Sequence, residues 1–305
     1  MKGSTRPRLA VVLDPGVDDG QHQRDRVAHL EDLGVDALYV GDHVAETAGP
    51  FATLGWLAGA TSLHLGTYVA CAPLRPVVES VREAIAVATL ARRPVRLGLG
   101  AGWQIADLDA AGVDPAGAAR HERVAEQLRA ARTLLDGQPA SGLGDRGWST
   151  GAPLPGAADA TVELALAASG PRMLELARAA DVVALAPRLA PGRHARGSAS
   201  GLSSAALEKK LCVLDAGPGR GPARSLLISV LRVGDRARLV DGVARSLGVA
   251  SEVIEGSPHV LIGDAGWLVE RVGELVDRYR LAELVVPEAA ARRAGSVIRT
   301  IAGAR

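Results

Sequence analysis

The chain has 305 residues, of which 48% are hydrophobic and 23% charged, the usual balance of a soluble globular protein. Its formal net charge of +1 argues against nucleic acid or a membrane surface as a partner. No uncharged apolar run reaches the ~18 residues of a transmembrane helix, and no signal-peptide core follows the N-terminus. We therefore expect a cytoplasmic protein. Cys71 and Cys212 form no C-x-x-C pair and no metal-ligand spacing, which predicts reduced thiols and no metal site.

Short apolar runs alternate with segments of helical periodicity along the chain. The first predicted helix covers Gln23–Leu33 and ends at Gly34. Later helices are indicated by apolar stripes at Val78, Val81, Ile85 and Ala88, at Val124, Leu128, Ala131 and Leu135, and at Leu268, Val272, Leu275, Val276 and Tyr279. The predicted strands are Leu9–Leu13, Ala37–Val40, Leu63–Ala70, Val95–Leu99, Val162–Ala167, Val182–Leu185, Leu226–Leu231 and Leu284–Val286.

Continuous apolar strands that alternate with helices predict a parallel sheet covered by helices. Eight such units in one chain fit an α/β protein with a single (β/α)8 TIM barrel spanning residues 1–305. A doubly wound open sheet is the alternative, but no G-x-G-x-x-G stands between the first strand and the first helix. Two stretches, Gln138–Ala160 and Pro187–Ser204, are rich in Gly, Pro or Ser and are predicted to be long loops, either lids or solvated tethers.

Chemistry on a barrel lies at the carboxyl ends of its strands, so the residues that follow each strand are the candidates. Asp42 and His43 follow the second strand, where His43 could position a substrate or relay a proton and Asp42 could orient its ring. The alternative is a polar pair that finishes the strand and caps a loop. The third strand ends Gly66–Cys71, whose small residues suit either a flat ligand or ordinary packing inside the barrel.

Two further strand ends carry candidate ligand contacts. The fourth ends Gly98-Leu99-Gly100-Ala101-Gly102-Trp103, and alternating glycines indicate close backbone contact with a neighbouring group, or a tight turn. The fifth is followed by Ser169, Gly170 and Pro171, which open a helix. Amides at a helix N-terminus, a Ser hydroxyl and Arg172 would suit a phosphate, although a plain helix cap is the alternative.

Together these strand ends resemble a known family. The segments Leu33–His43, Ala60–Val69 and Val95–Trp103 look like its second, third and fourth strands, and Ala168–Pro171 resembles its phosphate-binding turn. This is the luciferase-like monooxygenase superfamily. The segments Ser257–Gly263 and Val285–Glu288 look like an actinobacterial branch that uses the deazaflavin coenzyme F420. Departures from the family pattern include Asp107, where a Glu is usual, and an Asp14–Val17 loop without aromatic groups.

The resemblance implies an oxidoreductase that transfers a hydride between reduced F420 and an unidentified small organic substrate, with a homodimer as its assembly. His43 and Asp42 would be catalytic. The cofactor would contact Tyr68, Val69, Gly100, Ala101, Gly102 and Trp103, with its phosphate at Ser169 and Gly170. A non-prolyl cis peptide would lie at or near Tyr68–Val69. The alternatives are an FMN-dependent luciferase-like monooxygenase and a diverged barrel that has lost its cofactor and acts as a binding protein.

Overall fold

The computed structural model describes residues 6–13, 20–44, 46, 48–114, 119–142, 149–187, 199–217 and 219–303. Its strands are β1 (Arg8–Leu13), β2 (Ala37–Val40), β3 (His64–Thr67), β4 (Ala70–Cys71), β5 (Val95–Gly100), β6 (Val162–Ala168), β7 (Val182–Leu185), β8 (Ala223–Leu227), β9 (Val230–Val233), β10 (Val260–Gly263) and β11 (Leu281–Pro287).

The α-helices are α1 (Gly20–Asp32), α2 (Pro50–Ala60), α3 (Val77–Ala91), α4 (Ile105–Ala110), α5 (Ala119–Leu135), α6 (Pro171–Ala177), α7 (Ser204–Asp215), α8 (Arg236–Leu247), α9 (Ser251–Glu255), α10 (Ala265–Tyr279), α11 (Glu288–Arg293) and α12 (Gly295–Gly303). Two short 3-10 helices are η1 (Ala72–Leu74) and η2 (Ala199–Leu202). Among the described residues, no helix has the length and apolar character needed to cross a bilayer.

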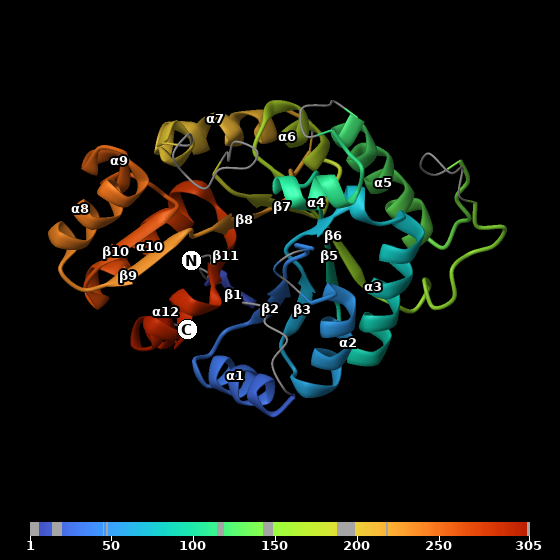
Figure 1. Ribbon diagram of the computed structural model, residues 1–305, viewed down its shortest axis with the longest axis horizontal. Helices are drawn as coiled ribbons and strands as arrows, with labels where there is room; N and C mark the ends of the chain where they lie inside the picture. Colours follow the sequence, from blue (N-terminus) through green and yellow to red (C-terminus); the bar gives the residue numbers. More distant parts are fainter. Residues whose placement is uncertain are drawn as a thin grey trace.

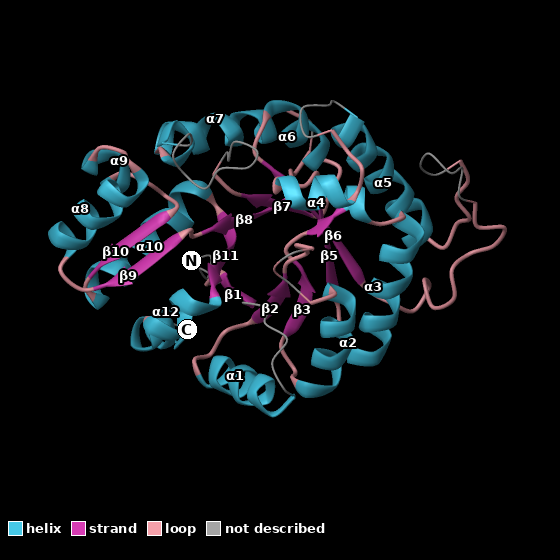
Figure 2. Cartoon of the chain, viewed as in Figure 1, coloured by secondary structure: helices cyan, strands magenta, loops and turns pink. Residues whose placement is uncertain are grey.

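Within the described part of the chain, the strands close into an eight-stranded parallel barrel. The order is β3-β2-β1-β11-β8-β7-β6-β5-β4, and the pairing of β3 with β5 closes the ring. Because β3 and β4 both pair with β5, they occupy one barrel position between them. Helices surround the strands (Figures 1 and 2). The predicted (β/α)8 barrel is therefore confirmed, and the open sheet is excluded.

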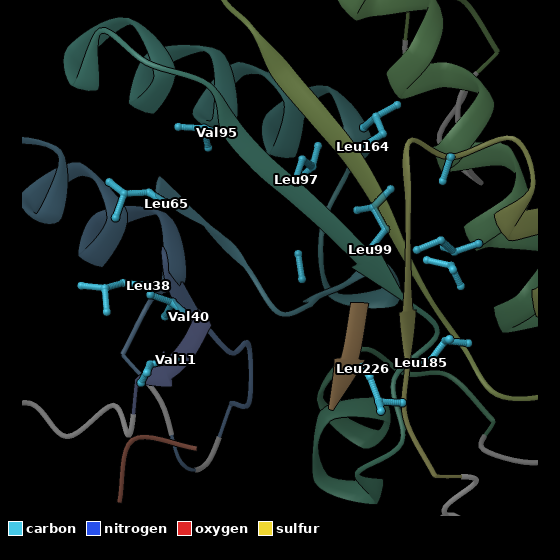
Figure 3. Packing of buried hydrophobic residues seen from close by; sticks show 14 of the residues in the cluster. Val11, Leu38, Val40, Leu65, Val95, Leu97, Leu99, Leu164, Leu185 and Leu226 are labelled. Atoms are coloured by element: carbon cyan, nitrogen blue, oxygen red, sulfur yellow. The ribbon is translucent and has the colours of Figure 1, made fainter. Parts of the chain in front are cut away.

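Side chains on a strand alternate between its two faces, so each barrel strand divides its residues between the helices and the interior. Val95, Leu97 and Leu99 of β5 lie with Leu164 of β6 in the large apolar cluster between strands and helices (Figure 3). The residues between them are Arg96 and Gly98. A separate interior cluster includes Ala10, Ala37, Tyr39 and Val285. The barrel interior thus combines small residues, two tyrosines and charged groups with a few aliphatic side chains such as Val285.

The predicted helical stripes are confirmed on α3 and α10, with Val276 only partly buried. On α5 the buried stripe ends at Leu134, and Leu135 is partly buried. The predicted strand Leu226–Leu231 was wrong as a single element. The chain finishes β8 at Leu227, leaves the barrel, and forms β9, which pairs in parallel with β10 outside it. With α8 and α9 these strands form a lobe beside the barrel that has its own apolar cluster (Figure 1).

The predicted long loops differ from one another. In the first, residues 138–142 and 149–160 are described, and Ala140, Leu154 and Ala157 are buried in the main apolar cluster, so these three residues anchor an otherwise largely exposed segment to the barrel. Of the second, residues 188–198 lie outside the described residues, whereas Ser203 caps α7 by accepting a hydrogen bond from the Ala206 amide at 3.2 Å. The Asp14–Val17 loop also lies outside the described residues.

Candidate functional site

His43 follows β2 at the carboxyl end of the barrel and is held by a carboxylate from a distant part of the chain. Its Nδ1 lies 2.8 Å from Oδ2 of Asp107, in α4, and the Val44 amide donates to Oδ1 of the same residue at 2.8 Å. Asp107 is almost fully buried, with 1% of its surface exposed. An ionised carboxylate only accepts hydrogen bonds, so Nδ1 carries the proton and the imidazole orientation is fixed.

Asp42, next to His43 in the sequence, binds the chain segment around Cys71 and Arg75 rather than the imidazole. Its Oδ2 accepts from the Cys71 amide at 3.0 Å and from Nε of Arg75 at 3.1 Å, and its Oδ1 accepts from the same guanidinium at 2.8 Å. This hydrogen bond to Asp42 is the main reason that the pKa of Arg75 is raised. The expectation that Asp42 orients the His43 ring is corrected: Asp107 contacts the ring, and Asp42 joins the end of β2 to Cys71 of β4 and to Arg75 beyond it.

The third strand is interrupted at Tyr68–Val69, whose peptide bond is cis. A cis bond at this position is what the family resemblance implied. The Tyr68 ring stacks on Tyr39 inside the barrel, with centroids 5.9 Å apart and planes 8° from parallel. The Tyr68 side chain therefore lies in the barrel interior, and its backbone is the part placed at the strand end.

The glycines of β5 are explained by this neighbouring strand. A Cβ at Gly98 would lie 2.4 Å from the Thr67 carbonyl oxygen, and a Cβ at Gly100 would lie 2.6 Å from Cγ2 of Val69. Real Cβ atoms essentially never lie this close to another atom, so a larger residue at either position would force the neighbouring chain to shift. The sequence pattern correctly predicted close backbone contact, but the contacting group at these two positions is the protein's own third strand.

Gly102, which follows β5, lies close to Cys71, the last residue of β4, and Trp103 comes next in the chain. Gly102 has a φ of +73°, and a Cβ there would lie 2.9 Å from the Cys71 Sγ. Burial raises the pKa of the Cys71 thiol to about 12, with Asp107 and Asp42 adding to the shift, so this thiol is not a nucleophile at neutral pH. The Trp103 ring meets the His43 ring edge-on, with centroids 5.8 Å apart. Ala101 is partly buried against the main core.

Ser169 and Gly170 lie between β6 and α6, at the same end of the barrel as His43. Gly170 is the N-cap of α6, no side chain caps the helix, and a Cβ at Gly170 would meet no described atom within 4 Å. The space beside the Gly170 Cα is therefore open, and the amides of Arg172 and Met173 at the start of α6 receive no side-chain cap. Arg172 does not join them, because its guanidinium lies 3.2 Å from the exposed Glu122 carboxylate.

Helix α5 supports both glycine-rich strand ends from outside, which the sequence alone did not reveal. Arg120 donates to the Gly102 carbonyl at 2.8 Å, and Gln127 donates to the carbonyls of Ala72 and Arg75 at 2.8 and 2.9 Å. The positions of Arg120 and Gln127 on an amphipathic helix could have suggested that they point toward the strand ends. The sequence could not show which carbonyl groups they bind. His259, by contrast, is a buried core residue, and burial lowers its pKa to about 4.

The structure resembles several solved enzymes. An F420-dependent secondary alcohol dehydrogenase, solved in complex with an F420-acetone adduct, superposes with a TM-score of 0.73 at 16% identity and covers 97% of this chain and 98% of its own. The oxygenating constituent of 3,6-diketocamphane monooxygenase from Pseudomonas putida, a type II Baeyer–Villiger monooxygenase in complex with FMN, gives 0.69 at 14% identity, covering 98% and 97%.

A third similar structure is the coenzyme F420-dependent tetrahydromethanopterin reductase from Methanopyrus kandleri, with a TM-score of 0.61 at 16% identity, covering 95% of this chain and 98% of its own. At these identities the likeness shows the fold. A comparison with curated protein sequences gives no match. The sequence model of the luciferase-like monooxygenase family matches residues 4–224, which is more than half of the chain. The protein therefore belongs to the luciferase-like monooxygenase family.

Proposed function

We propose that this protein transfers a hydride between the deazaflavin coenzyme F420 and a small organic substrate, with His43 as the proton-exchanging residue. The observation that carries the proposal is the His43–Asp107 pair, because a carboxylate that fixes one imidazole nitrogen prepares the other for proton transfer. Asp107 stands where the family usually has a Glu, and the shorter side chain still reaches the ring.

The residues at this end of the barrel fit a flat cofactor that carries a phosphate. The backbone at Tyr68–Val69 and the Gly100–Trp103 turn lie on adjacent strands, and β4 joins β5 there through Ala70 and Leu99. Ser169 and the uncapped amides of α6 offer hydrogen-bond donors for an anion. The space beside Gly170 admits a group at that position. When bound, the deazaflavin would supply or accept the hydride.

His43 then has one defined role in the proposed reaction. With Nδ1 protonated toward Asp107, Nε2 is the ring atom that exchanges a proton with the substrate as the hydride moves. Asp107 keeps the ring in this orientation through its hydrogen bond to Nδ1. Trp103, edge-on to His43, restricts the ring from its side.

FMN is the alternative cofactor, favoured by the likeness to the FMN-containing Baeyer–Villiger enzyme. The deciding experiment titrates the apoprotein with F420 and with FMN while tryptophan fluorescence is recorded. We expect saturable quenching by F420 that is lost in Trp103→Phe, and weaker binding of FMN. Tighter binding of FMN would favour the monooxygenase, and binding of neither would favour the diverged barrel.

The phosphate position is tested by Gly170→Glu. An acidic residue at a helix N-terminus does not disfavour the helix, and the space around Gly170 is open. The fold should therefore survive while the new carboxylate repels the cofactor phosphate. Gly170→Ala is the matched control and should bind the cofactor like the wild type. Unchanged cofactor affinity in a folded Gly170→Glu variant would refute this placement.

A further inference from the structure

Thr67 ends β3 at a point where the backbone ladder between the third strand and β5 is interrupted. The last register pair before the interruption is Gly66 with Arg96, and the first pair after it, formed by β4, is Ala70 with Leu99. Between these pairs the third strand takes four steps and β5 takes three. One extra residue therefore lies on the third strand, which is the arrangement of a β-bulge.

The Thr67 hydroxyl joins the two strands where the ladder is missing. It donates to the Gly98 carbonyl oxygen at 2.8 Å and accepts from the Gly98 amide at 2.9 Å. In the described register, Gly98 has no partner on the third strand, so its two backbone groups depend on a side chain. Both residues are buried, with Thr67 at 0% exposed. A hydroxyl can donate and accept at once, so one threonine satisfies both groups.

Residues 67–69 are held from two sides. Toward β5, a Cβ added at Gly98 would lie 2.4 Å from the Thr67 carbonyl oxygen, so the missing side chain lets the two backbones approach closely. Toward β2, the Tyr68 amide donates to the Val40 carbonyl oxygen at 2.8 Å. The Thr67 hydroxyl is thus the side-chain link to β5, and the Tyr68 amide is the backbone link to β2.

The backbone of this segment is the part that faces the candidate site. The Tyr68 ring turns into the barrel interior and stacks on Tyr39, and its hydroxyl is buried. The Val69 side chain packs toward β5, because a Cβ added at Gly98 or Gly100 would lie within 3.0 Å of one of its methyl carbons. Tyr68 and Val69 are nevertheless partly exposed. Their backbone is therefore the surface that a flat ligand at the strand end would contact.

We propose that Thr67 is a positioning residue for the cofactor. Its hydroxyl sets the place of the Tyr68–Val69 backbone relative to β5, and that backbone supports the flat ring. The inference rests on the proposed function because it concerns the same site. Thr67 is fully buried, so it acts through its neighbours and touches neither the cofactor nor the substrate. Without the hydroxyl, two buried groups of Gly98 lose their partner and the strand end shifts.

The test compares two substitutions that differ in the hydroxyl. Thr67→Val has nearly the shape of threonine without the hydroxyl, whereas Thr67→Ser keeps the hydroxyl and loses a methyl group. The dissociation constants of the full chain for F420 and for FMN are measured by titration. A misplacement of about 1 Å can cost ~100-fold at an active site. We therefore expect Thr67→Val to bind the cofactor about tenfold or more weakly and Thr67→Ser to bind it close to wild-type strength.

Val240→Ala is the control for a loss of stability alone. Val240 is 2% exposed in the apolar cluster of the lobe beside the barrel, so its truncation destabilises the protein away from the site. Cofactor affinity per folded molecule should then match the wild type. Should Thr67→Val fail to fold, Thr67→Cys replaces it, since a thiol is only a weak hydrogen-bond donor and acceptor.

A second readout needs no cofactor. The chain has three tyrosines, Tyr39, Tyr68 and Tyr279, so labelling with fluorotyrosine gives three fluorine resonances that single Tyr→Phe variants assign. In Thr67→Val the Tyr68 resonance should shift while that of Tyr279, in α10, stays in place. Thr67→Ser should restore the wild-type spectrum. An unmoved Tyr68 resonance would overturn the proposal, as would wild-type cofactor affinity in a folded Thr67→Val variant.

The remaining outcomes separate this proposal from the proposed function. Equal weakening of cofactor binding in Thr67→Ser and Thr67→Val would contradict a role for the hydroxyl. An equally large loss of affinity in Val240→Ala would assign the effect to stability and overturn the positioning role. Binding of neither cofactor by the wild type is a different failure, because it overturns the proposed function and, with it, the role of Thr67 toward a cofactor.

Discussion

Asp107 reaches His43 across 64 residues of sequence, with its Oδ2 lying 2.8 Å from the imidazole Nδ1. The contact joins the loop after β2 to the helix after β5. Because Asp107 also accepts the Val44 amide, it fixes both the ring and the backbone that carries it. The two residues act as one unit, and this makes separable predictions about activity and stability.

His43→Ala should lower turnover by ~100-fold or more, the usual contribution of a positioned proton donor or acceptor. The partly exposed ring contributes little to the core, so the cost to stability should be limited to the buried Asp107 oxygen that loses its partner, about 1–3 kcal/mol. Turnover is measured as oxidation or reduction of F420 with a substrate panel, alongside a thermal melt. A variant that loses stability and keeps its activity per folded molecule would assign His43 a structural role.

Asp107→Asn should reproduce much of this loss while the ring remains present. An amide can hold the wrong imidazole tautomer by donating to Nδ1, which moves the proton to Nε2. We expect turnover to fall in this variant, because the ring atom that should exchange the proton then faces the substrate in the wrong protonation state. Full activity in the folded variant would show that Asp107 only supports the loop.

Asp42→Ala should instead reduce stability. Asp42 is 5% exposed and accepts three hydrogen bonds, and its removal leaves the buried Cys71 amide without its acceptor. An unsatisfied buried donor costs about 1–3 kcal/mol, and the broken pair with Arg75 adds to this. Urea unfolding measures the loss. Arg75→Gln keeps the Asp42–Cys71 bond and should cost less; the opposite ranking would contradict the interpretation.

The sequence predicted the barrel because the continuous apolar runs of the strands and the helical stripes are local signals. It did not predict that the chain leaves the barrel after Leu227. The run Leu226–Leu231 is apolar except at Ser229, so nothing in it marks the boundary between β8 and β9. Nor could it pair His43 with Asp107 in place of the adjacent Asp42, since the pairing depends on how two strand ends meet. The interior cluster around Arg96 and Glu283 was also missed. Its signal was present as charged residues inside otherwise apolar strands.

Gly100→Ala tests whether β5 needs glycine for packing. A Cβ there would lie 2.6 Å from the Val69 side chain, so the strand end has to shift, at a cost of about 1–3 kcal/mol. Gly170→Ala, with no described atom within 4 Å of the new Cβ, is the control and should leave the unfolding free energy nearly unchanged. Equal stability of the two variants would show that Val69 moves aside without cost.

His64 gives the protein a predictable sensitivity to acid. It lies at the start of β3, edge-on to the Tyr39 ring. Burial, with Arg8 and Arg96 nearby, lowers its pKa from 6.5 to about 3, while Glu283 opposes the shift and Arg93 adds to it. The unfolded chain therefore binds a proton as pH falls below ~6.5 and the folded chain does not. Stability from this group is complete above the unfolded pKa and is lost as pH falls toward the folded one.

Near pH ~5 the loss attributable to His64 is about 2 kcal/mol. His64→Phe keeps an aromatic edge against Tyr39 and cannot be protonated. Urea unfolding at neutral and mildly acidic pH should show a smaller drop in unfolding free energy for His64→Phe than for the wild type. Carboxylates and the buried His259 titrate in both proteins, so the difference between the two drops isolates His64. Identical drops would mean that His64 takes up its proton in the folded barrel as readily as in the unfolded chain.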